Sequence, residues 1–247
     1  MKFMKRIYEA LGYEPPDDSS SIGKLEQIED ILGQPLPPAV KEWYAKEKAV
    51  EIMASRTCDR PVPLCELGNI VADWNHDGPR DFLAQGRLYV MTENQGVCNW
   101  VVDLAGSDDP ELLVEVDSSP NNIWTLYSPH FSEWVYTLLT DWLPTGSSML
   151  CAQDISLADA DLAWLRDHLE PGPVTYSWPC PVNYRFRHLD QRVLILACDG
   201  QADWHISAAS EESLRDLVAK LWNLGALSNS LYSSDETGQK VLDCLRR

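Results

Sequence analysis

The 247-residue sequence contains none of the short motifs that identify a common catalytic or nucleotide-binding site. It has no glycine-rich phosphate loop and no Gly-x-Ser-x-Gly nucleophile elbow. Its five histidines lie at no close metal-ligand spacing from one another or from a cysteine. We therefore predict a non-enzymatic protein without metal or cofactor, and keep an uncharacterised enzyme as the second alternative function.

Positive charge is scarce along the whole chain. Twenty Lys and Arg against 38 Asp and Glu give a formal net charge of −18. Binding to nucleic-acid phosphates or to an anionic membrane requires clustered Lys and Arg, so the sequence predicts neither kind of partner. An acidic surface suits either solubility or attraction to a basic protein.

The sequence also lacks the features of a secreted or membrane protein. Its seven cysteines are an odd number without Cys-x-x-Cys spacing, which is typical of reduced thiols rather than of a disulfide framework. No apolar segment follows the basic start Met1–Arg6, so no secretory signal is predicted there. The longest strongly apolar stretch, Val193–Cys198, is too short to cross a bilayer. We predict a cytoplasmic location.

Periodicity in the first half predicts helices followed by antiparallel strands. Apolar residues recur at helical spacing in Lys24–Gly33, after a breaker that includes Ser19–Ser21. A Pro-led helix is predicted to continue from Pro38 through Ile52. Ser132 is the predicted N-cap of a closing helix. Strands are predicted, between turn signals, over Gly86–Met91, Val97–Leu104, Leu112–Val116 and Ile123–Leu126.

The segment Pro144–Ser148 predicts a boundary between two domains, 1–146 and 147–247. The second domain has a predicted helix over Ser156–Leu169, four short strand candidates and a helix that begins after Ser210. We predict a small C-terminal α/β domain, whose role the sequence does not indicate.

Several motifs of the first half resemble the SMI1/KNR4 (SUKH) family. Glu29–Pro38 is similar to the family's E-x-x-LG-x-x-LP opening. Phe82–Trp142 is similar to the rest of its core, with Glu93–Gly96 at a hairpin and Trp100 on the next strand. The resemblance spans residues 20–143 and departs from the family at Ala45–Ala49, where members usually have an Asn-Gly or similar turn.

This resemblance implies an α+β fold and a role in binding proteins. The expected N-terminal domain is an antiparallel sheet with packed helices, and the predicted core lies between them. Many bacterial members of the family resemble immunity proteins that neutralise toxins, often nucleases, while a yeast member regulates cell-wall synthesis and signalling. The family offers no catalytic residue to transfer. The predicted core residues are Trp100, Val101, Leu113, Trp124 and Phe131.

Acidic residues are concentrated between Asp59 and Asp141, where 14 Asp and Glu face only three Lys and Arg. A field of one sign accelerates encounter with an oppositely charged partner, and a nuclease toxin has a basic cleft. We therefore predict an immunity-type protein that binds a basic toxin domain stoichiometrically; the alternative is an intracellular regulator or scaffold. The predicted binding face, for which a merely solvated surface is the other interpretation, comprises Asp73, Asp77, Asp108, Asp109, Glu111, Glu115 and Asp117.

Overall fold

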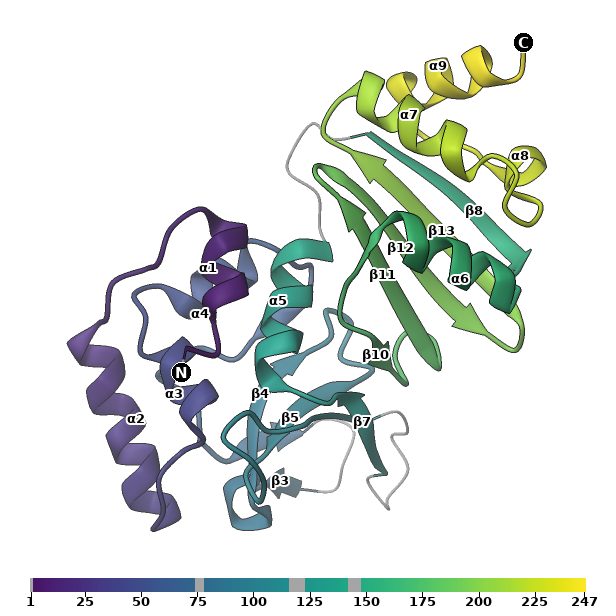
Figure 1. Cartoon of the computed structure of the whole chain (residues 1–247). Coiled ribbons are helices and arrows are strands. Elements are labelled where there is room, and N and C mark those ends of the chain that lie inside the picture. Colours follow the sequence, from purple (N-terminus) through teal and green to yellow (C-terminus); the bar gives the residue numbers. More distant parts are fainter. Residues whose placement is uncertain (1, 74–77, 116–122, 142–147) are drawn as a thin grey trace. The chain divides into compact units, whose positions relative to one another are not determined.

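The structure, a computed structural model, describes residues 2–73, 78–115, 123–141 and 148–247 (Figure 1). The chain divides into two compact units, Met1–Trp142 and Leu143–Arg247. The predicted boundary after residue 146 lies outside the described residues. Nine α-helices and two larger antiparallel sheets, of five and six strands, occur in the described ranges, which confirms the predicted α+β class.

The first helices of the N-terminal unit begin and end differently from the prediction. α2 begins at Ser19 because the Asp18 carboxylate accepts hydrogen bonds from the backbone N–H groups of Ser20 and Ser21. The last three residues of the predicted breaker, Ser19–Ser21, therefore belong to the first turn of this helix. Ile31, predicted on the buried face, is 69% exposed. The helices of this unit are α1 (Lys5–Leu11), α2 (Ser19–Leu32), α3 (Pro38–Tyr44), α4 (Ala49–Ala54) and α5 (Phe131–Asp141).

The predicted long helix after Pro38 is two helices, α3 and α4. The break is marked by Lys48, whose φ of 57° is left-handed. It is stabilised by Lys46, whose buried ammonium lies 2.9 Å from a Glu14 carboxylate oxygen and 2.8 Å from an Asp17 one. A turn therefore occupies Ala45–Lys48, although the sequence there has no turn-forming residue.

The N-terminal sheet has the strand order β1-β4-β5-β6-β7, with every pair antiparallel. Trp100 and Val101 are neighbours on β5 and point to opposite faces, yet both are at most 1% exposed. Phe82 covers part of the second face, where its ring stacks on Tyr89 with centroids 5.1 Å apart. The strands of this unit are β1 (Arg60–Pro61), β2 (Val71–Asp73), β3 (Gly78–Arg80), β4 (Arg87–Thr92), β5 (Asn99–Asp103), β6 (Leu112–Glu115) and β7 (Trp124–Ser128).

The predicted N-terminal core is confirmed in part. Trp100, Val101 and Phe131 are buried, whereas Leu113 and Trp124 are half-buried. α5 packs in this core and contacts α1, α3, α4 and β7. Ser132 lies inside α5 and is not its N-cap, because the helix begins one residue earlier, at Phe131.

The C-terminal unit is α+β rather than the predicted α/β, because its strand pairs are all antiparallel. β8 lies at one end of the order β10-β11-β12-β13-β8, and β9 pairs with β11. The prediction missed β8 and assigned its first residues to the linker. The strands of this unit are β8 (Ser148–Ser156), β9 (Glu170–Pro171), β10 (Thr175–Tyr176), β11 (Val182–His188), β12 (Gln191–Cys198) and β13 (Gln201–Ala208).

Helices of the C-terminal unit share one hydrophobic core with one face of its sheet. Leu165 of α6, Leu217 of α7 and Leu242 of α9 pack with Ile195 and Trp204 in this core. The predicted cap of α7 is confirmed, because the Ser210 hydroxyl accepts a hydrogen bond from the Ser213 N–H. In the described ranges, no helix of either unit is long and apolar enough to cross a membrane. The helices are α6 (Asp159–His168), α7 (Glu211–Leu221), α8 (Leu227–Ser230) and α9 (Glu236–Leu245).

Candidate partner-binding site

The predicted acidic residues that the structure describes lie at two ends of the N-terminal sheet. Asp108, Asp109 and Glu111 belong to the loop that leads into β6, whereas Glu115 is the last residue of that strand. Four strand positions separate Glu111 from Glu115, a distance of about 13 Å. Glu115 therefore lies apart from the other three residues, which share one loop.

The other three residues of the predicted face do not add side chains to the candidate site. Asp77 and Asp117 lie outside the described residues. The backbone of Asp73 ends β2 and pairs with Gly78. The candidate site is accordingly built from the loop between β5 and β6.

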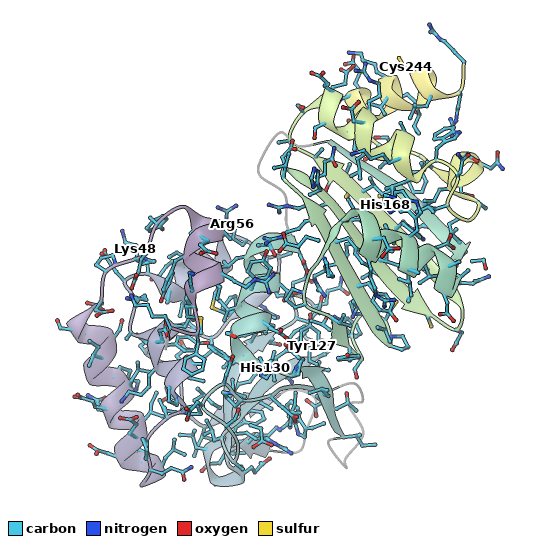
Figure 2. The ribbon with its side chains drawn as sticks, in the orientation of Figure 1. Lys48, Arg56, Tyr127, His130, His168 and Cys244 are labelled. Atoms are coloured by element: carbon cyan, nitrogen blue, oxygen red, sulfur yellow. The ribbon has the colours of Figure 1, made fainter. Side chains whose placement is uncertain are left out.

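This loop is fixed by hydrogen bonds to two helices. The Ala39 N–H, in α3, donates to the Asp108 carbonyl at 2.9 Å, and the Phe131 N–H donates to the Pro110 carbonyl at 2.7 Å. Asp108 and Glu111 are exposed, and their carboxylates have no partner among the described residues. The loop thus holds these two carboxylates on a backbone fixed at two points. His130, labelled in Figure 2, lies in the turn between β7 and α5, and its Nδ1 is 3.3 Å from the Asp109 carbonyl oxygen of this loop.

Asp109, between them, has a structural contact instead. Its Oδ1 accepts from the Ser132 backbone N–H at 2.9 Å, and its Oδ2 accepts from the Ser132 hydroxyl at 2.5 Å. A carboxylate placed there satisfies an N–H of the first helical turn and interacts favourably with the helix dipole. The Asp109 carboxylate therefore caps α5.

Glu115 is buried, which corrects its assignment to an exposed face. Its side chain is 4% exposed and that of Arg80 5%, and the Arg80 Nη1 lies 3.0 Å from Glu115 Oε2. Asn99 Nδ2 donates to the same carboxylate oxygen at 3.1 Å. The ion pair joins the end of β3 to the sheet, so we assign Glu115 a structural contact.

Sequence reasoning missed an aromatic and cationic cluster on the same face of the sheet. The Arg80 guanidinium carbon lies 4.6 Å from the centre of the Phe82 ring and 5.4 Å from that of Trp124. The Arg87 guanidinium carbon lies 5.1 Å from the centre of the Trp124 ring. The available signal was compositional, since Arg80 and Arg87 are two of only three basic residues between Asp59 and Asp141.

The C-terminal sheet holds a cysteine and a histidine that sequence reasoning also missed. Cys151 on β8 pairs across the strands with His205 on β13, and Sγ lies 3.6 Å from Nδ1. Burial raises the pKa of the Cys151 thiol and lowers the pKa of the His205 imidazole. Both shifts favour a neutral pair, whereas a nucleophilic cysteine needs a lowered pKa. Among the described residues, no group of three or more His, Cys, Asp and Glu could hold a metal ion.

Comparison of the chain with protein-family models, with curated protein sequences and with solved structures finds no match. The resemblance to the SMI1/KNR4 family therefore rests on the sequence motifs alone.

Proposed function

We propose that this chain is a non-enzymatic, cytoplasmic protein of the SMI1/KNR4 type that neutralises a basic toxin domain by stoichiometric binding. The proposal joins the family resemblance to the surplus of acidic residues between Asp59 and Asp141. A nuclease is the best-motivated toxin, because its nucleic-acid cleft is basic. The partner contacts a smaller surface than the sequence predicts, centred on Asp108 and Glu111.

The observation that carries this proposal is the fixed loop between β5 and β6. Asp108 and Glu111 are exposed there, and neither carboxylate has a partner among the described residues. The neighbouring backbone is bonded to α3 and α5, so little conformational entropy is lost when a partner binds. Unpaired charges on a rigid loop accelerate encounter with a basic surface and fix the orientation of the partner.

A further support comes from the cysteines and from the Cys151–His205 pair. All seven cysteines are free, which fits a reducing compartment. The raised pKa of the Cys151 thiol is unsuited to nucleophilic catalysis, so this pair gives no support to the alternative of an enzyme.

The test begins with the reading frame beside this chain's own gene, which the proposal expects to encode a toxin-like protein. The purified proteins are mixed, complex formation is measured by light scattering, and toxin activity is titrated against this chain. We expect a one-to-one complex and complete inhibition at equimolar ratio. Reversal of both loop charges, Asp108→Lys with Glu111→Lys, is expected to slow association and to flatten its dependence on salt.

A matched control reverses two exposed charges elsewhere in the same unit, Glu26→Lys with Asp30→Lys on α2. Both double variants change the net charge equally, so only the loop variant should lose affinity strongly. Thermal melts establish that both variants remain folded. Equal effects of the two variants would mean that the overall negative charge of the protein, and not this loop, attracts the partner. Binding to a partner that is not a toxin would favour the alternative of a regulator or scaffold.

A further inference from the structure

Arg87 is the unusual member of the aromatic and cationic cluster. It is half-buried on β4, and its guanidinium has no hydrogen bond or ion pair within the described part of the chain. Its cross-strand neighbour is Asp103, but the Asp103 Oδ1 accepts a hydrogen bond from the Ala105 N–H instead. An arginine without an anionic partner stands out in a protein of net charge −18.

The position of this guanidinium is fixed by an aromatic ring. It lies over Trp124, 5.1 Å from the ring centre, in the range of a cation–π contact. A guanidinium held against an indole is planar and already ordered, so it loses little freedom when it binds a ligand. None of the N–H donors of Arg87 is bonded to an acceptor among the described residues.

A second positive charge lies near the same ring. Arg80 is 5.4 Å from the Trp124 ring centre, and its charge is offset by the buried carboxylate of Glu115. The charges of Arg80 and Glu115 therefore offset each other, whereas Arg87 forms no ion pair with Asp103, its cross-strand neighbour. An unpaired guanidinium beside an aromatic ring, at a partly desolvated site, favours an anion.

We propose that Arg87, held by Trp124, is a binding site for an oxyanion, namely the carboxylate or phosphate group of a small ligand. The guanidinium fork matches both groups through two parallel N–H···O hydrogen bonds. The site goes beyond the proposed function, because its ligand has the opposite charge to the basic partner of the loop between β5 and β6. This proposal does not depend on the proposed function, and the two are tested separately.

The test follows the indole N–H signal of Trp124 by ¹⁵N NMR, with the signal assigned from a Trp124→Phe variant. Sodium phosphate and sodium acetate are titrated separately, with sodium chloride at equal ionic strength as the reference. We expect a saturable shift of the Trp124 signal with phosphate, with acetate or with both, and none with chloride. Phosphate alone identifies a phosphate site and acetate alone a carboxylate site.

Two variants of Arg87 and one control decide the role of the fork. Arg87→Lys keeps the charge but loses the planar fork, and should weaken binding roughly tenfold, while Arg87→Gln should abolish it. The control is Arg56→Gln, which removes an equal charge from the segment after α4 (Figure 2) and should leave binding unchanged. Equal binding by the Arg87→Lys variant, equal loss in the control, or a shift that chloride reproduces would overturn the proposal. Thermal melts of each variant establish that it is folded.

Discussion

Asp109 and Ser132, 23 residues apart, join the loop between β5 and β6 to the first turn of α5. Two hydrogen bonds connect them, one from the Ser132 N–H and one from its hydroxyl, each to a different carboxylate oxygen. α5 contacts three other helices of the N-terminal unit and the edge strand β7. The Asp109 side chain therefore helps to position α5. The same contact holds the loop that carries Asp108 and Glu111.

Replacement of Asp109 by Ala removes this cap. We expect a loss of about 0.5–2 kcal/mol in the free energy of unfolding, measured by urea denaturation. The adjacent Asp108→Ala is the matched control, because the Asp108 side chain is exposed and has no partner within the described residues. It should change stability by less than about 0.5 kcal/mol. Equal losses for the two variants would contradict the capping role.

The buried ion pair of Arg80 and Glu115 predicts a different pattern of losses. Glu115→Ala leaves the Arg80 guanidinium buried without that carboxylate and is expected to cost about 3–5 kcal/mol. The double change Arg80→Met with Glu115→Leu removes both charges and should recover much of that loss, because two apolar side chains require no solvation. Denaturation of the three proteins measures this. A double variant less stable than Glu115→Ala would show that the pair contributes net stability.

The elements that the sequence predicts correctly are those with local signals. β4, β5 and β6 are separated by turn residues, and α7 begins after Ser210, whose hydroxyl caps it. β8 was missed because its first residues follow a run of Pro, Gly and Ser, and because Asp154 interrupts its alternation with a left-handed φ of 52°. Its nine residues become a strand through pairing with β13, which lies about 50 residues further along the chain.

The candidate site shows the same limit. Asp108 and Glu111 follow a turn signal, so their exposure is a local property. No sequence pattern near Glu115 indicates that its side chain is buried, because its partner Arg80 lies 35 residues earlier in the sequence and the two meet only in the folded protein. The contact between Arg87 and Trp124 likewise depends on the tertiary structure, because β5 and β6 lie between their two strands in the sheet.

Two glycines should respond in opposite directions to Ala. A Cβ on Gly238, in α9, would lie 2.7 Å from the Ser233 Cβ, and the Ser233 hydroxyl is held by a 3.0 Å hydrogen bond to the Met149 carbonyl. Gly238→Ala is expected to cost about 1–3 kcal/mol by overpacking. A Cβ on Gly23, inside α2, has nothing within 4 Å, so Gly23→Ala should gain about 0.5–1 kcal/mol from higher helix propensity.

The pair of glycine variants is compared by thermal melts under identical conditions. A melting temperature that rises for Gly23→Ala and falls for Gly238→Ala is the expected result. A rise for both would show that Ser233 moves aside at little cost.

His205 predicts how the stability of the C-terminal unit depends on pH. Burial holds its pKa below the ordinary value of 6.5, against a weaker opposite effect of Asp203. As the pH falls, the unfolded chain therefore takes up a proton at this position before the folded one does. The stability contributed by the neutral imidazole is complete above about pH 7.5, and it is lost as the pH falls through 6.5 towards the folded pKa.

The expected measurement is the free energy of unfolding between about pH 5 and pH 8, for the native chain and for His205→Gln. The variant cannot titrate at this position, so its stability should fall less steeply below about pH 6.5. His188→Gln, at the exposed end of β11 in the same sheet, is the matched control, because it removes an exposed imidazole by the same substitution. Groups remote from position 205 are the same in all three proteins, so the difference between the curves reports on His205 and its immediate neighbours. Parallel curves for the His205→Gln variant and the native chain would show that the imidazole is not desolvated, and that its contact with Cys151 is open to water.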